Sequence, residues 1–167
     1  MASELARYIL RNCTIFVDRE NKIGQASEIT IPVPQRTTTA IRNAGMMKTR
    51  NIELGYEALT LAFKMTAFDP QVIKLFASRT DKEYMVTGAF VDEDGTIHSA
   101  VCTMLGKLTS TDAGAFKPGE LQESDFSVDV NYLKLEMDGE VLLEMDDFEV
   151  ISGGVSQTGG IRAAMLM

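Results

Sequence analysis

A strict alternation of polar and apolar residues runs through Asp125-Phe126-Ser127-Val128-Asp129-Val130-Asn131-Tyr132. Successive side chains of a β-strand point to opposite faces of its sheet, so this spacing predicts a strand with one buried and one wet face. The wet face would carry Asp125, Ser127, Asp129 and Asn131. The stretch therefore indicates a β protein whose sheet covers an apolar core.

Further strands are expected on both sides of this stretch. The pairs Asp94-Gly95 and Asp138-Gly139 favour tight hairpin turns, the first between strands at 84–90 and 96–108 and the second before a strand at 141–150. Nearer the N-terminus, strands are expected at 13–17 and 28–31, the second returning from a polar turn at 18–24. Residues 5–10 could form a short helical arm.

The clearest helix signal is Phe68-Asp69-Pro70-Gln71-Val72-Ile73-Lys74-Leu75-Phe76. Asp69 is a good N-cap residue and Pro70 suits the first helical position. Before it, residues 54–65 have apolar side chains on a period of two, which favours a long strand over the competing helix.

Between these elements, the segment from Pro32 to Asn51 is polar and basic, and its prolines end the preceding strand. Loops of this length are usually functional or disordered, so it is either a surface loop or an arm that packs on another subunit. The C-terminal residues 152–167 are rich in glycine, and we expect a flexible tail there.

These elements predict one domain over residues 1–167, mainly β with one α-helix, as a β-sandwich or partial barrel with the helix packed against it. The chain has 167 residues and a net charge of −8. It lacks the clustered Lys and Arg that grip nucleic-acid phosphates. Cys13 and Cys102 lie in apolar, strand-like surroundings typical of buried, reduced thiols, although a disulfide between them stays open.

No residues form a convincing catalytic, cofactor or metal site. His98 is the one histidine, and we interpret it as a half-exposed strand residue. The acidic run at 92–94 lacks the spaced oxygens of a calcium loop and predicts a solvated turn. The carboxylates Glu144, Asp146, Asp147 and Glu149 favour a solvated strand face over acid–base catalysis. We therefore expect no enzyme activity.

Several segments, in order along the chain, resemble the major tail tube proteins of contractile-tailed bacteriophages and R-type pyocins. They are Phe16-Val17-Asp18 with Ile29-Thr30-Ile31-Pro32; Ala44-Gly45-Met46-Met47 with residues 52–59; residues 68–76; Lys117-Pro118-Gly119-Glu120; residues 132–139; and Asp146 with Gly154-Val155 and Ile161-Arg162-Ala163-Ala164. No single motif is diagnostic, but their shared order is specific.

The resemblance implies hexameric rings that stack into a hollow tube, with an assembly loop at about 32–52. The candidate contacts between rings or subunits are Arg42, Gly45, Met46, Met47, Arg50, Leu54, Tyr56 and Glu57. The wet face of the strand at 125–131 is the candidate lining of the lumen. An acidic lining would let DNA slide without binding.

The resemblance also implies partners and a location. The partners are the chain itself, the tail sheath protein, the tape measure protein, the baseplate and tail terminator proteins, and double-stranded DNA that passes without specific binding. The location is the virion tail tube, assembled in the host cytoplasm. Two alternatives remain: the tube of an R-type pyocin or type VI secretion-like injection machine, and a monomeric β-barrel that binds a small ligand.

Overall fold

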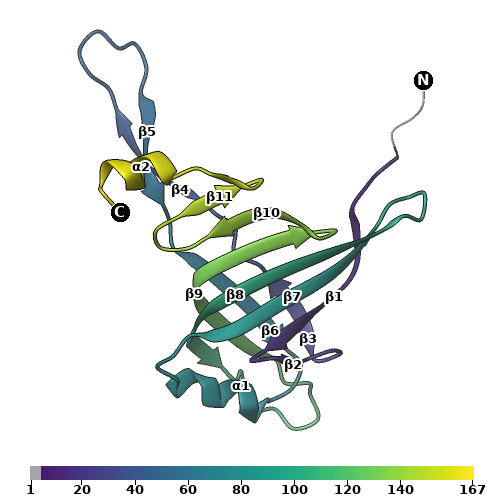
Figure 1. Cartoon of the computed structure of the whole chain (residues 1–167). Helices are drawn as coiled ribbons and strands as arrows, with labels where there is room; N and C mark the ends of the chain where they lie inside the picture. Colours follow the sequence, from purple (N-terminus) through teal and green to yellow (C-terminus); the bar gives the residue numbers. More distant parts are fainter. Residues whose placement is uncertain (1–4) are drawn as a thin grey trace.

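The structure is a computed structural model that describes residues 5–167, so residues 1–4 of the predicted domain lie outside it. Antiparallel strands dominate, with short helices at two places (Figure 1). In chain order the elements are β1 (Ile9–Val17), β2 (Glu20–Asn21), β3 (Ala26–Thr30), β4 (Arg36–Ile41), β5 (Arg50–Tyr56), β6 (Leu59–Met65), α1 (Pro70–Lys74), the 3₁₀ turn η1 (Leu75–Ala77), β7 (Lys82–Val91), β8 (Ile97–Asp112), β9 (Ser124–Met137), β10 (Glu140–Met145), β11 (Val150–Ser152), β12 (Val155–Ser156) and α2 (Gly159–Ala164).

Strand β9, which contains the alternating stretch, is the branch point of the main sheet. The sheet runs β12-β11-β10-β9-β8-β7-β1-β2, and β6 pairs with β9 and with β3. The first half of β9, up to Val130, pairs with β6, whereas its second half, from Leu133, pairs with β10. Because β1 and β3 do not pair, the sheet curls without closing into a barrel. The mainly β fold is thus confirmed.

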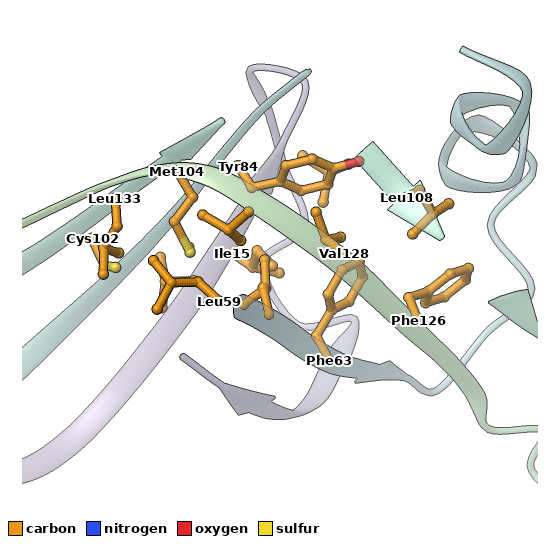
Figure 2. Packing of buried hydrophobic residues seen from close by; sticks show 14 of the residues in the cluster. Ile15, Leu59, Phe63, Tyr84, Cys102, Met104, Leu108, Phe126, Val128 and Leu133 are labelled. Atoms are coloured by element: carbon orange, nitrogen blue, oxygen red, sulfur yellow. The ribbon is translucent and has the colours of Figure 1, made fainter. Parts of the chain in front are cut away.

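The core lies inside this curl (Figure 2). Phe63 of β6 stacks on Phe126 of β9 with ring centroids 5.1 Å apart. Around them the fully buried side chains include Ile15, Leu61, Met65, Tyr84, Met104 and Val128. Val128 and Phe126 come from the predicted apolar face of β9, so the period-two argument identifies the core face correctly.

Helix α1 begins as predicted, with Asp69 as N-cap. The Asp69 side chain accepts a hydrogen bond from the Gln71 N–H at 2.9 Å. Its other oxygen lies 2.9 Å from the Nζ of Lys22, which is almost fully buried in the turn before β3. This ion pair fastens the helix to the end of the curled sheet, since a buried charge is stable only beside a partner.

Four local predictions were wrong. The segment expected to be a loop contains β4 and most of β5, which pair as a separate two-stranded sheet. The long strand expected at 54–65 is broken at Glu57-Ala58 into β5 and β6. Residues 5–8 are irregular and β1 begins at Ile9, so no helical arm forms there. Strand β3 pairs with β6 rather than with β1.

The C-terminal tail also differs from expectation. Within residues 152–167, where a flexible tail was expected, the chain forms β12 and helix α2. The Thr158 hydroxyl accepts a hydrogen bond from the Val150 N–H at 3.2 Å, and Arg162 forms an ion pair with Glu149 at 3.1 Å. These contacts tie the tail back to the edge of the sheet.

Candidate assembly surfaces

The paired strands β4 and β5, with their connecting tip at 42–49, form a ribbon that projects away from the sheet (Figure 1). Within residues 5–167, no other strand or helix packs extensively against the ribbon. An isolated two-stranded hairpin is marginally stable in water. The ribbon is therefore the part of the fold that gains most from a partner.

The two faces of the ribbon differ. Residues directly opposite each other share a face, and Thr39 faces Ile52 while Ile41 faces Arg50. The other face is polar: Thr38 lies opposite Glu53, whose carboxylate pairs with Arg36 at 3.1 Å. One face is thus partly apolar and exposed, and the other carries a surface ion pair.

The tip of the ribbon is a compact turn. The Arg42 Nε–H donates to the Met46 carbonyl at 3.3 Å, and the Met46 N–H donates to the Asn43 carbonyl at 3.0 Å. Gly45 has a φ of +86°, which only glycine adopts readily. Met47 is 94% exposed, an unusual position for a large apolar side chain.

The structure gathers the eight predicted contact residues on this ribbon and its base. Arg42, Gly45, Met46 and Met47 lie at the tip, Arg50, Leu54 and Tyr56 on β5, and Glu57 directly after it. Tyr56 packs against the core. The Glu57 N–H donates to the Gln35 carbonyl at 2.9 Å, so the two ends of the ribbon meet. Their role in contacts between subunits stays a prediction.

The four candidate lumen residues lie on the outer side of β9, away from the core. Asp125 and Asp129 are exposed and Ser127 is half-buried. Basic residues stand beside them: Lys64 lies opposite Asp125 on β6, and Lys107 lies opposite Asp129 on β8. Asn131 sits where the pairing of β8 and β9 shifts, and its amide donates to Asp81 at 2.9 Å. This face is polar and of mixed charge.

Of the four carboxylates expected on a solvated strand face, Asp147 is exposed, and the other three have structural partners. Glu144 accepts from the Tyr132 hydroxyl at 2.7 Å, and Glu149 pairs with Arg162. Asp146 accepts from two backbone N–H groups of the turn that follows it. In residues 5–167, no group of three or more His, Cys, Asp or Glu side chains is placed to hold a metal ion.

His98 lies in strand β8, as expected, but it binds two carboxylates that the sequence did not suggest. Its Nε2 lies 3.0 Å from Asp92 Oδ2 and its Nδ1 lies 2.6 Å from Asp138 Oδ2, and only 16% of the side chain is exposed. Asp92 also accepts from the Tyr8 N–H at 2.7 Å. His98 therefore links the β7–β8 turn, the β9–β10 turn and the N-terminal segment.

The two carboxylates shift the ionisation of this cluster. Hydrogen bonds to Asp92 and then to Asp138 raise the pKa of His98 above 6.5. The pKa of Asp138 is lowered below 3.8 by its bond to His98, and that of Asp92 is lowered first by the Tyr8 N–H. His98 stabilises the fold fully below pH 6.5, and this stabilisation is lost as the pH rises through its raised pKa.

Because His98 is the only histidine, its titration can be followed without ambiguity by the imidazole C2 proton in an NMR spectrum. We expect a midpoint above 6.5 in the folded subunit, and a lower midpoint in Asp92→Asn, which removes the carboxylate. The urea-unfolded chain is the control and should titrate near 6.5. A folded midpoint at or below 6.5 would contradict the cluster.

The two cysteines are free. Cys102 is buried, and burial raises the pKa of its thiol to about 11. Cys13 is exposed, contrary to the expected buried position. Both side chains border an apolar groove of about 280 Å³. The sequence did not indicate this groove because its lining residues come from six strands.

None of the helices in residues 5–167 is long and apolar enough to cross a membrane.

The described residues thus form a curled, open antiparallel sheet from which one two-stranded ribbon projects. The fold is similar to that of solved chains from the extracellular contractile injection system PVC. One comes from its sheath/tube terminator, with a TM-score of 0.57 and 10% identity over 75% of this chain and 93% of that one. The other comes from its sheath–tube complex, with a TM-score of 0.53 and 10% identity over 81% and 93%.

The chain belongs to the phage tail tube protein FII family, whose model matches residues 7–165. It is 29% identical to the tail tube protein of Escherichia phage P2 over 148 residues, 85% of this chain and 86% of that protein. It is 27% identical to the major tail tube protein of Serratia phage KSP20 over 139 residues, 82% and 81% of the two chains. The chain is thus a structural subunit of a contractile tail tube, and phage tail tube proteins are virion components.

Proposed function

We propose that this subunit forms hexameric rings that stack into the inner tube of a contractile phage tail, the channel for genome delivery. The observation that carries the proposal is the β4–β5 ribbon, which has no extensive packing within its own described chain. Unpaired strand edges and a head-to-tail contact that does not close on itself together produce a filament.

The partners follow from this role. The subunit binds copies of itself in the tube, the tail sheath protein that the tube templates, the tape measure protein within it, and baseplate and tail terminator proteins at its ends. Assembly takes place in the host cytoplasm. The residues of the ribbon and its base supply contacts between rings. The subunit has no catalytic role.

The lumen is lined by the polar face that includes Asp125, Ser127, Asp129 and Asn131. Lys64 and Lys107 neighbour the carboxylates of this face, but each also pairs with a further carboxylate, Glu28 at 3.4 Å and Asp81 at 3.9 Å, so four carboxylates surround two lysines. A channel of overall negative charge repels phosphates, so double-stranded DNA passes without specific binding.

A pyocin or type VI secretion-like tube is the alternative function, since such machines share the tube architecture. The greater identity to proteins of phages P2 and KSP20 than to the injection-system chains favours the phage tail. Neighbouring genes distinguish the two: sheath and tape measure genes beside a capsid cluster indicate a phage, and the same genes without capsid genes indicate a pyocin.

Electron microscopy of the purified protein in negative stain tests the proposed function. We expect rings or hollow tubes, either spontaneously at high protein concentration or after addition of sheath protein and baseplate. A uniform population of monomers under all of these conditions would overturn the proposal. Size-exclusion chromatography of the same samples gives the fraction of subunits that has assembled.

A further inference from the structure

The apolar groove lies on the inner face of the curled sheet, at the end farthest from α1. Its lining includes Leu10, Ile31, Phe90, Ala100, Leu135 and Leu142. At the opposite end of the sheet, the inner face is covered by β6 and forms the core, whereas at the groove only Ile29 of β3 and Ile31 after it border the face. Leu10 is 53% exposed and Leu142 is 40% exposed as a result.

The rim of this groove is acidic. Phe90 and Met137 border the groove, and the β7–β8 and β9–β10 turns follow them directly. These turns carry Asp92, Glu93, Asp94 and Asp138, and Glu140 begins the strand after the second turn. His98 binds two of these carboxylates, while the other three are exposed.

The ribbon has the complementary pattern. Residues 36–56 contain four basic side chains and one acidic side chain, a net charge of +3, which leaves −11 for the rest of the chain. Three of the basic residues, Arg42, Lys48 and Arg50, lie at or beside the tip. Behind them on β5 come the exposed apolar residues Ile52 and Leu54.

We propose that the ribbon of one subunit lies in the apolar groove of a second copy, with its basic tip against the acidic rim. Along the ribbon, the basic residues at the tip are followed by apolar residues on β5. Along the groove, the acidic rim is followed by the apolar lining, so the two orders match. Ile52 and Leu54 would cover a sheet face that is otherwise exposed, and opposite charges would fix the direction of insertion.

This inference rests on the proposed function, since it names the surface that receives the ribbon in the assembled tube. Each subunit gives one ribbon and receives another, so the contact is head-to-tail and propagates without closing. A ribbon that ran into the groove of its own chain would end the assembly, and the structure directs it away from its own sheet (Figure 1).

The exposed Cys13 at the groove makes the contact testable by cross-linking. In tubes of Leu54→Cys, a short bismaleimide should join position 54 of one subunit to Cys13 of the next and give a ladder of dimers, trimers and higher species on a denaturing gel. The ladder should disappear in Leu54→Cys with Cys13→Ser. It should also be absent in Thr38→Cys, which places the thiol on the face of the ribbon opposite to that of Ile52.

The outcomes separate this inference from the proposed function. If no tubes form under any condition, the proposed function fails. If tubes form but Leu54→Cys gives no ladder, or a ladder that survives Cys13→Ser, the groove does not receive the ribbon and the inference is overturned. Ile52→Cys repeats the test should Leu54→Cys prevent assembly, and unassembled subunits of either variant should give no ladder.

Discussion

Replacing residues 37–55 by an Asn-Gly turn is expected to give a folded subunit that no longer forms tubes. The replacement is possible because Arg36 and Tyr56 pair directly opposite each other, next to the 2.9 Å backbone hydrogen bond from Glu57 to Gln35, so a two-residue turn can join the two strands. The body should keep its fold because Tyr56, which packs against the core, is retained, and no other strand or helix packs extensively on the removed residues. Assembly should be lost because the proposed contact between subunits is gone.

Circular dichroism and electron microscopy together measure this result. The truncated subunit should show the β spectrum and the urea unfolding midpoint of the full chain, with monomers in the microscope at concentrations where the full chain forms tubes. The control is Thr38→Ala, which changes the polar face of the ribbon and should leave assembly intact. Long tubes formed by the truncated subunit would contradict the role of the ribbon.

The largest loss of stability is expected from Phe63→Ala. Phe63 is 2% exposed and stacks on Phe126, so truncation leaves a cavity at the centre of the core. Removing a buried phenylalanine costs about 3–5 kcal/mol of unfolding free energy, a large part of the 5–15 kcal/mol typical of a domain. The variant would then keep only a small part of its unfolding free energy at physiological temperature.

The same substitution at an exposed position provides the control. Phe116 is 74% exposed, and Phe116→Ala should change the unfolding free energy by no more than about 0.5 kcal/mol. Urea unfolding of the unassembled subunits, followed by circular dichroism, compares the two. Equal losses for the two variants would mean that Phe63 is not at the centre of the core.

The sequence predicts the parts of this fold that are encoded locally. The alternation at 125–132 identifies both the central strand β9 and its buried face. The turns at Asp94-Gly95 and Asp138-Gly139 connect the expected hairpins. Asp69 and Pro70 mark the start of α1 because capping depends on only a few neighbouring residues.

What the sequence does not predict depends on pairing between distant segments. The ribbon escaped prediction because β4 reads Arg-Thr-Thr-Thr-Ala-Ile, with neither face apolar enough to suggest a buried strand. The sequence also does not indicate that both faces of the ribbon are exposed, which is seen only in the fold. The contact between His98 and Asp138 was not predicted either, because these residues lie 40 positions apart on different hairpins. One signal in the sequence could have indicated this contact: both hairpins have an acidic residue in their turn, and the two turns lie at the same end of the sheet.

The hydrogen bond between Gln35 and Glu57 has a consequence for how tubes of this kind diversify. Since the ribbon leaves and re-enters the body at a single point, its length and charge can change without disturbing the packing of the sheet. Changes in the ribbon and in the surface that receives it would then keep the subunits of two phages in one host from mixing. Exchange of the ribbon between related subunits would change which subunits polymerise together.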